Sequence, residues 1–313
     1  MPEIELAGAP DGFPYDGRGA VVTVGTFDGV HLGHADVLTR LAARGRATGL
    51  RSLLVTFDPH PAEVVKPTKA PLLLTVGDEK LAALAATGVE LCAVLPFTRA
   101  LAGYDAAEFV DRVLRQRFHM RELLVGYDHG FGRDRAGGVE VLRRLGEAEG
   151  FRVEVVPPYR LEDGDTVSST LIRRAVQEGD LAAARRALGR PYSVTSRVVR
   201  GEQRGRLLGF PTLNLGAPPA RKLLPPGGVY AVRVQTPLGE FGGMMNLGPR
   251  PTFGDDRPSL EAHLFDARGD FYDAPVSVAF VERLRDTRAF SGPEALVAQL
   301  RDDAERARGA LTV

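Results

Sequence analysis

The chain has 313 residues, which is long for a single hydrophobic core and favours two domains. Hydrophobic residues make up 44% of it and charged residues 26%, a composition typical of globular proteins. Lys plus Arg and Asp plus Glu each total 40, so the formal net charge is +0, which argues against a nucleic-acid partner.

Short apolar runs alternate with helical patterns from residue 18 to about residue 188. This alternation predicts a mostly parallel sheet with helices on both faces, a Rossmann-like α/β architecture. Strands are expected at residues 20–24, 52–57, 91–95, 122–125 and 152–156. Helices are expected between them, at residues 35–48, 77–86, 106–118 and 138–149.

The segment VGTFDGVHLGHADVL joins the first predicted strand to the first predicted helix. Gly25, Gly29 and Gly33 let the backbone turn sharply, and the N–H groups of a first helical turn can bind an anion. His31 and His34 stand at this junction and can donate hydrogen bonds to phosphate oxygens. The order of strand, glycine-bearing loop and helix start therefore predicts a phosphate-binding site.

Two histidines near a turn could also be structural, and their spacing could equally belong to a metal site. The context favours phosphate, because HLGH follows a strand and opens a helix. The tetrapeptide is similar to the HxGH signature of the nucleotidyltransferase superfamily. In that superfamily the two histidines contact the triphosphate of a nucleotide.

Polar and glycine-rich segments also follow three other predicted strands, at the edge where α/β sheets bind ligands. They are FDPHP, GYDHGFGR and a loop that ends in SSTLIR. Ser168, Thr170 and Arg173 of the last segment read as a capped helix start with a cation one turn on. An ordinary helix cap gives the same pattern. Because this helix start occurs together with the glycine-bearing loop and HLGH, we expect it to form the second half of a triphosphate site.

The pattern changes near Gly189, where helical periodicity gives way to short alternating runs. Gly- and Pro-rich turns separate these runs, which predicts an antiparallel β-barrel followed by a C-terminal helix. The strands are expected at residues 192–199, 211–215, 229–234, 242–247, 260–265 and 276–281, and the helix at 293–308. The domain boundary is therefore predicted at about residue 187.

The sequence contains one cysteine, Cys92, which cannot form an intrachain disulfide and lies in an apolar run. The N-terminal segment is acidic and lacks the apolar core of a signal peptide, and no apolar stretch has the length of a membrane span. We therefore expect a cytoplasmic protein with no membrane partner. The sequence leaves the oligomeric state open.

Taken together, both halves of the chain resemble the family of prokaryotic bifunctional riboflavin kinase/FMN adenylyltransferases, also called FAD synthetases. The resemblance covers about residues 18–308 and rests on GTFDGVHLGH, FDPHP, VGYDHGFG, SSTLIR, GRLLGFPTLNL, NLGPRPTFG and EAHLFDARGDFYD. It implies that residues 188–313 form a riboflavin kinase domain, which makes FMN from riboflavin and ATP. Residues 1–187 would form an FMN adenylyltransferase domain, which makes FAD from FMN and a second ATP and releases pyrophosphate.

The resemblance implies residues for the kinase step. The ribityl hydroxyl of riboflavin is a poor nucleophile, so a carboxylate base is expected, and the family pattern assigns it to Glu261. Alternation alone would not select Glu261 among the strand carboxylates. Thr212 and Asn214 stand two apart on a predicted strand, so their oxygens face the same side and suit Mg²⁺. Gly205 and Arg206 look like part of the ATP loop of this domain.

Adenylyl transfer needs no strong base, because the FMN phosphate is already ionised. Alignment and charge neutralisation are expected to drive it, with Mg²⁺ assisting. The resemblance assigns ATP binding to Gly25, Phe27, Asp28, His31, His34, Ser168, Thr170 and Arg173. It gives His31, His34 and Arg173 a share in catalysis. Asp128 is assigned to the flavin, together with Pro59 and His60, which shape the same cleft.

Three residues depart from the family pattern. Leu213 stands where the family usually has alanine, and because it faces away from Thr212 and Asn214, we expect packing rather than chemistry to change. Asp273 and Ser196 stand where glycine is common. If either glycine normally has a positive φ, the replacement would strain or reshape its turn.

Two alternatives compete with a flavin enzyme of two activities. The first is a single-activity FMN adenylyltransferase whose barrel senses flavin without catalysis, which would make no FMN from riboflavin. The second is an RNA-associated module on an HxGH scaffold, which would need a basic or anticodon-binding extension and strong salt dependence. The presence of Thr212, Asn214 and Glu261 together argues against the first, and the neutral charge argues against the second.

Overall fold

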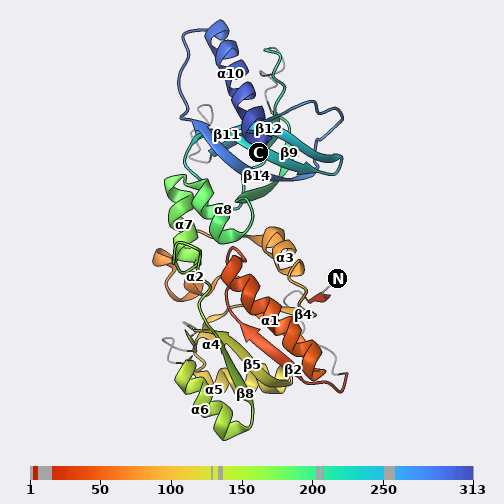
Figure 1. Cartoon of the computed structure of the whole chain (residues 1–313), viewed down its shortest axis with the longest axis vertical. Coiled ribbons are helices and arrows are strands. Elements are labelled where there is room, and N and C mark those ends of the chain that lie inside the picture. Colours follow the sequence, from red (N-terminus) through yellow and green to blue (C-terminus); the bar gives the residue numbers. More distant parts are fainter. Residues whose placement is uncertain are drawn as a thin grey trace. The chain divides into compact units, whose positions relative to one another are not determined.

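The computed structural model describes residues 3–5, 16–127, 130–132, 137–201, 205, 208–249 and 258–312. The chain divides into two compact units, residues 1–168 and 169–313. Figure 1 shows that the first unit is an α/β structure and the second is a barrel with helices. The predicted boundary near residue 187 lies further along the chain and stays a prediction.

The first unit contains a six-stranded sheet in the order β1-β4-β3-β2-β5-β8, in which all neighbours pair in parallel. The predicted parallel sheet and all five predicted strands are thereby confirmed. Strand β1 was not predicted, because its three residues Glu-Ile-Glu contain no apolar run. The strands are β1 (Glu3–Glu5), β2 (Ala20–Val24), β3 (Arg51–Phe57), β4 (Leu91–Leu95), β5 (Met120–Gly126) and β8 (Arg152–Val156).

Helices cover both faces of this sheet, because successive strand residues point to opposite sides. Val21 and Leu54 pack with residues of α1 (Leu32–Thr48) and α3 (Gly77–Ala85) on one face. Val22 and Leu53 pack on the other face with residues of η2 (Phe109–Arg117) and α6 (Val139–Glu149). The shorter elements are α2 (Pro61–Val65), η1 (Pro67–Lys69), α4 (Arg99–Ala102), α5 (Ala106–Glu108), β6 (Gly130–Phe131) and β7 (Gly137–Gly138).

The four predicted helices of this unit are present, and one differs in its hydrogen bonding. The segment predicted at residues 106–118 starts as the short helix α5 and continues as η2, a π-helix. Its buried side chains still face the sheet. The apolar pattern therefore located the helix but did not reveal its wider winding.

The second unit contains a closed antiparallel barrel in the order β10-β13-β12-β11-β14-β9, which confirms the predicted barrel. Two helices precede it, α7 (Ser169–Glu178) and α8 (Leu181–Leu188). The barrel strands are β9 (Ser193–Val199), β10 (Leu213–Leu215), β11 (Gly228–Thr236), β12 (Gly239–Pro249), β13 (Pro258–Leu264) and β14 (Pro275–Arg285).

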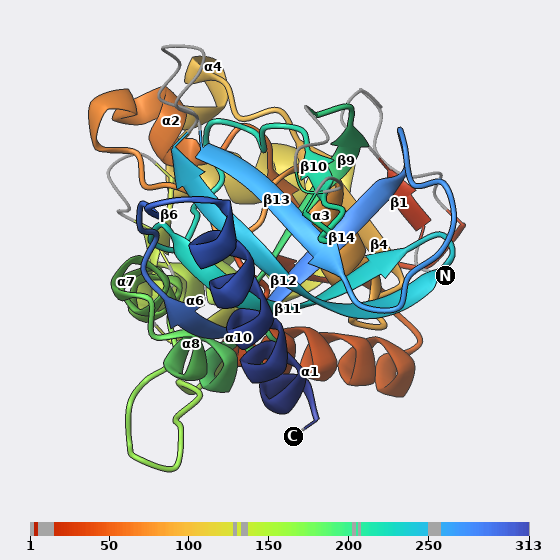
Figure 2. The same ribbon diagram turned by 90° about the horizontal axis from the view of Figure 1, so that it is seen from above.

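The predicted C-terminal helix is α10 (Pro293–Leu311), which lies against β11, β12 and β14 on the outside of the barrel (Figure 2). Ala307 of the helix packs there with Val229, Ala231 and Phe265. Asp303 is fully buried and accepts hydrogen bonds at 2.9 Å, 3.0 Å and 2.6 Å from the guanidinium of Arg285. This buried ion pair fixes the helix on β14.

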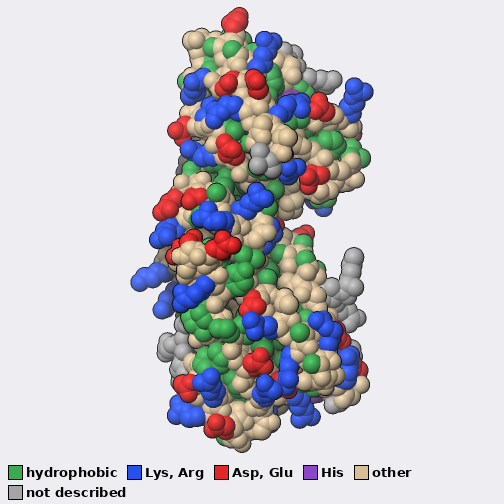
Figure 3. Space-filling model, in the orientation of Figure 1, with side chains coloured by type: hydrophobic (Ala, Val, Ile, Leu, Met, Phe, Trp, Pro, Cys, Tyr) green, Lys and Arg blue, Asp and Glu red, His purple; other side chains and the backbone are tan. Residues whose placement is uncertain are grey.

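Acidic and basic side chains are interspersed on the face shown in Figure 3, in keeping with the balanced composition. Among the described residues, no helix is both long enough and apolar enough to span a membrane.

Candidate active sites

His31 is the N-cap of α1 and is buried. Its Nδ1 accepts a hydrogen bond from the backbone N–H of His34 at 3.2 Å, which places the proton of the neutral ring on Nε2. The rings of His31 and His34 stack with centroids 3.6 Å apart. The HLGH tetrapeptide thus forms a helix start with two adjacent imidazoles, as predicted from the order of its parts.

His34 is partly buried, and its pKa lies well below the usual 6.5. Burial is the main cause, and the charges of His31 and Lys80 add to it. Its Nδ1 is shielded from solvent and has no hydrogen-bond partner among the described residues. A buried polar atom without a partner is uncommon in folded proteins and is one mark of a functional site.

Asp28 holds the loop between β2 and α1 in place. Its buried carboxylate accepts hydrogen bonds from the backbone N–H groups of Leu74 at 2.9 Å and Thr75 at 3.0 Å. The N–H of Gly29 donates to the hydroxyl of Thr75 at 3.0 Å. These bonds tie the loop to the segment that leads into α3. Direct contact of Asp28 with ATP stays a prediction.

The same loop is closely packed around the two histidines. Phe27 is buried, has a φ of 46° and lies 5.0 Å from the His34 ring between centroids. A Cβ at Gly25 would approach the Phe27 ring to 3.0 Å, and one at Gly33 would approach the His31 ring to 3.3 Å. Gly25 and Gly33 therefore leave room for the rings. The positive φ of Phe27 is a strained conformation of the kind that gathers at functional sites.

The FDPHP segment follows β3 at the same edge of the sheet, because Val24 and Val55 are paired in parallel. His60 is the N-cap of α2, and its Nδ1 accepts a hydrogen bond from the N–H of Ala62 at 3.1 Å. Pro59 is exposed beside it. The structure brings both residues to the edge where the HLGH loop begins, and their contact with flavin stays a prediction.

Lys80 reaches the same edge and was not singled out from the sequence. Its ammonium group donates to the carbonyl oxygen of Phe57, the last residue of β3, at 3.1 Å. A lysine in the first turn of an amphipathic helix gives no sequence signal of its own, because such residues usually face solvent.

For some of the other residues assigned to adenylyl transfer, the structure shows only the element on which they lie. The helix expected after Ser168 is present, since α7 begins at Ser169. Thr170 and Arg173 lie on α7 in the second unit, so their share in the ATP site stays a prediction. Asp128 and Arg206 lie outside the described residues.

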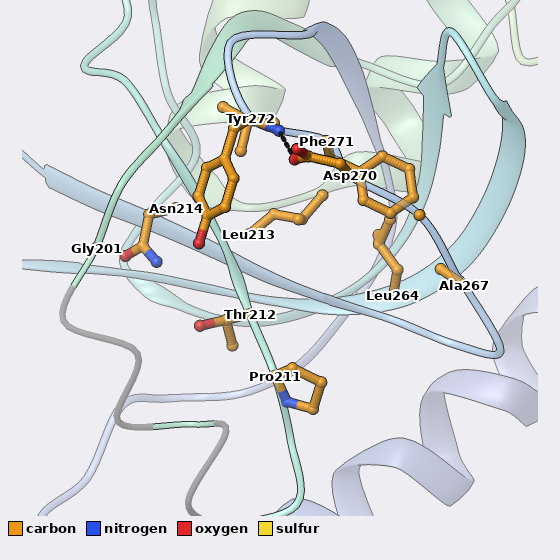
Figure 4. Close-up of a pocket in the computed structure, with 12 residues that line it drawn as sticks. Gly201, Pro211, Thr212, Leu213, Asn214, Leu264, Ala267, Asp270, Phe271 and Tyr272 are labelled. Carbon is orange, nitrogen blue, oxygen red and sulfur yellow. Dashed lines mark hydrogen bonds between the residues drawn. The ribbon is translucent and has the colours of Figure 1, made fainter.

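The second unit contains a pocket of about 380 Å³ beside β10 (Figure 4). Its polar wall includes Thr212 and Asn214, and its apolar wall includes Leu213 and Leu264. The lining residues are Val198, Gly201, Pro211, Thr212, Leu213, Asn214, Leu264, Ala267, Gly269, Asp270, Phe271 and Tyr272.

Thr212 and Asn214 point to one side of the chain and Leu213 to the other, as Figure 4 shows and as the sequence predicted. Leu213 nevertheless lines the pocket, so its size affects pocket shape as well as packing. A Cβ at Gly201 would overlap the side-chain amide of Asn214. Gly201 therefore makes a cradle for this amide. A hydroxyl and an amide oxygen on one side form a donor set that fits a hard divalent cation.

Glu261 lies on β13 and is not among the residues that line this pocket. It is directly opposite Asn214 of β10 and directly opposite Asn246 of β12 in the antiparallel register. Its carboxylate accepts a hydrogen bond from the hydroxyl of Ser259 at 3.0 Å. Opposed residues of antiparallel strands share a face, so the carboxylate and the two amides form a row across three strands. Asn246 was not assigned from the sequence, because strand register depends on distant pairing.

The segment that leads into β10 is a tight turn at Gly205. The carbonyl of Gly205 accepts hydrogen bonds from the N–H groups of Leu208 at 3.1 Å and Phe210 at 2.9 Å. A Cβ there would overlap the carbonyl oxygen of Phe210. The close backbone approach accounts for glycine at this position, and its contact with ATP stays a prediction.

The two residues that stand where the family commonly has glycine, Asp273 and Ser196, differ in backbone conformation. Asp273 has a φ of 58°, the left-handed region that favours glycine, so its turn carries the strain that the sequence raised as a concern. Ser196 lies in β9, paired with Val276, and its hydroxyl donates to the carbonyl of Gly216 at 2.7 Å. Extended strand backbone accepts any side chain, so no strain arises at Ser196.

Comparison with known proteins agrees with this arrangement. A family model for FAD synthetase matches residues 14–171, and one for riboflavin kinase matches residues 188–311. A bifunctional riboflavin kinase/FMN adenylyltransferase from Pseudomonas fluorescens is 40% identical over 292 residues, 93% of each chain. One from Escherichia coli K12 is 37% identical over 293 residues, 93% of this chain and 92% of that protein.

A solved structure has the same fold over nearly the whole chain. It is described as a macrolide-efflux protein from Streptococcus pneumoniae, is 30% identical, and superposes with a TM-score of 0.86. The match covers 97% of this chain and 98% of that one. The likeness extends through both units.

Proposed function

The chain belongs to the family of bifunctional riboflavin kinase/FMN adenylyltransferases, and we propose that it carries out both reactions of this family. The barrel domain phosphorylates riboflavin with ATP to give FMN. The α/β domain transfers AMP from a second ATP to FMN, which gives FAD and pyrophosphate. The observation that carries this proposal is the presence, in one chain, of the HLGH helix start and the Asn214–Glu261 row.

For adenylyl transfer, we assign the phosphates of ATP to the HLGH loop. His31 presents its Nε2 proton, because Nδ1 already caps α1. His34, whose ring stacks on that of His31, would contact the same phosphates through its other ring nitrogen. Hydrogen-bond donors aimed at the phosphates stabilise the charge that shifts to pyrophosphate as the bond to the α-phosphorus breaks. Gly25, Phe27 and Asp28 hold the loop in this shape.

We propose that further residues, whose contacts with the substrates the geometry does not establish, belong to the same site. Ser168, Thr170 and Arg173 at the start of α7 would bind the same ATP, since hydroxyls, helix N–H groups and a guanidinium suit phosphate. Pro59 and His60 would contact FMN from the end of β3, together with Asp128.

For phosphorylation, we assign Glu261 as the base that removes the proton of the ribityl hydroxyl. The Ser259 hydroxyl orients its carboxylate. Thr212 and Asn214 would hold Mg²⁺, which when bound offsets the negative charge of the ATP phosphates. Gly201 leaves room for the Asn214 amide. Gly205 and Arg206 would contact ATP.

The remaining assignments complete the proposal. The adenylyltransferase domain spans residues 1–187 and the kinase domain residues 188–313, in line with the limits of the two family-model matches. A cytoplasmic location fits a chain whose single cysteine cannot form an intrachain disulfide. The partners are the flavins and ATP, and nucleic acid is not among them.

The test is a time course of purified protein with riboflavin, ATP and MgCl₂, in which chromatography separates riboflavin, FMN and FAD. FMN should appear first and FAD should follow. FAD formed only after FMN is supplied would reduce the barrel to a flavin sensor. No conversion of either flavin would refute the proposed function.

A further inference from the structure

Lys80 occupies a position that the mechanism above does not use. It lies in the first turn of α3, and its Nζ is 3.1 Å from the carbonyl oxygen of Phe57 at the carboxyl end of β3. The HLGH loop leaves the neighbouring strand β2 at the same edge. The ammonium group therefore lies where parallel α/β sheets bind their ligands.

The helix that bears Lys80 is fixed to the HLGH loop. Asp28 accepts hydrogen bonds from Leu74 and Thr75, and Gly29 donates to Thr75, directly before α3 begins at Gly77. Movement of the loop and of the start of α3 is therefore coupled. This connection gives Lys80 a defined place relative to His31 and His34 within the first unit.

The position is unfavourable for a lysine kept for stability. The side chain is partly buried, and burial lowers the pKa of Lys80. The N-terminal end of a helix also repels positive charge. An ammonium group has three N–H donors, and within the part of the chain that the structure describes its one hydrogen bond goes to a neutral carbonyl. An anionic ligand would offset both costs.

The neighbours of Lys80 point to the same kind of ligand. Its charge is among the causes that lower the pKa of His34, so the two side chains lie within electrostatic range of each other. The charges of Asp28 and Asp58 favour its charged form. The Asp28 carboxylate already accepts backbone hydrogen bonds, and Asp58 is exposed. The first turn of α1 and that of α3 thus bring His34 and Lys80, two nitrogen-bearing side chains, to one edge of the sheet.

We propose that Lys80 binds the phosphate chain of ATP in the adenylyl transfer site, beside the HLGH histidines. The proposal rests on the proposed function of the α/β domain and adds a residue from α3 to it. A lysine ammonium is a compact point charge that neutralises phosphate oxygens without fixed geometry. Lys80 would therefore act both on entering ATP and on the departing pyrophosphate.

The test compares Lys80→Met with wild type in the conversion of FMN and ATP to FAD. Methionine keeps the length and removes the charge. We expect kcat/KM for ATP to fall by about 100-fold, while KM for FMN changes by less than about 3-fold. In the reverse reaction from FAD and pyrophosphate, KM for pyrophosphate should rise. Lys80→Arg should restore most of the activity, because it restores the charge.

Two controls separate binding from structure. Lys69→Met removes an exposed lysine a short distance earlier in the chain and should behave as wild type. Riboflavin phosphorylation by the Lys80→Met chain should be unchanged, and its melting temperature should not fall, because the replacement removes a partly buried charge that burial disfavours. If Lys80 served to stabilise the fold, the Lys80→Met variant would instead have a lower melting temperature than wild type.

Two results would overturn the proposal. One is FAD formation by Lys80→Met within about 3-fold of wild type. The other is a loss in which KM for ATP and for pyrophosphate stay unchanged and the melting temperature falls. If wild type itself formed no FAD from FMN, the proposed function would fail, and this outcome is distinct from both.

Discussion

Asn214 on β10 lies directly opposite Glu261 on β13 in the antiparallel register of the barrel. The pairing puts an amide and a carboxylate on one face, although their motifs are far apart in the chain. Asn214 belongs to the proposed Mg²⁺ site and Glu261 is the proposed base. The barrel therefore brings together the two groups that phosphoryl transfer from ATP to an alcohol requires.

Glu261→Gln is expected to abolish the kinase and spare the adenylyltransferase. Glutamine keeps the size of the side chain and can still accept from Ser259, but it cannot take up a proton. Riboflavin phosphorylation should fall by about 10²- to 10⁴-fold, with FMN adenylylation unchanged. Glu282→Gln, at an exposed carboxylate on β14, is the matched control. Normal phosphorylation by the Glu261 variant would exclude Glu261 as the base.

Gly201→Ala tests the cradle around Asn214. The added methyl group would overlap the Asn214 amide and displace it. We expect the Mg²⁺ concentration for half-maximal kinase activity to rise by about 10-fold, with adenylyl transfer unchanged. Gly309→Ala, where a Cβ meets nothing within 4 Å, is the control. An unchanged Mg²⁺ requirement would argue against Asn214 as a ligand.

His31 has two roles that different replacements separate. His31→Ala should abolish FAD formation and also destabilise the first unit by about 1 kcal/mol, because it removes the N-cap of α1. Asparagine is a preferred N-cap residue, so His31→Asn should keep the stability and still lack FAD formation. Activity assays and urea unfolding of both variants provide the comparison. Substantial FAD formation by His31→Asn would contradict the proposed phosphate contact.

We expect the free energy of unfolding to depend on pH through His34. Burial lowers its pKa well below 6.5, so the unfolded chain binds a proton near pH 6.5 while the folded chain does not. Stability from this group is therefore complete above that pH and is lost as the pH falls below it. Urea unfolding should show that His34→Asn loses less stability than wild type between about pH 7.5 and about pH 5.5. An equal loss in both proteins would contradict the shift.

Most of the fold was predictable, because the apolar runs coincide with strands. The runs at residues 91–95 and 152–156 match β4 and β8 at both ends. Strand β1 could not be predicted, since Glu3–Glu5 depends on pairing with β4 and has no apolar pattern. The local periodicity of a sequence indicates which residues are buried, but it does not indicate which strand pairs at the edge of a sheet.

The candidate sites were predictable where the chemistry is local. HLGH can be recognised by its place between a strand and a helix. Thr212 and Asn214 can be recognised by their spacing. Lys80 and Asn246 were missed, because their positions depend on which distant elements pack together. The GDFYD motif was recognised, but the place of Tyr272 in the pocket follows from barrel closure.

The central claim is that one chain holds two active sites that work independently. The most direct measurement mixes the purified Glu261→Gln and His31→Asn variants with riboflavin, ATP and MgCl₂ and follows FAD by chromatography. Neither variant alone should make FAD from riboflavin, and the mixture should make it, because one supplies FMN to the other. A mixture that forms no FAD, under conditions in which wild type does, would contradict two independent sites.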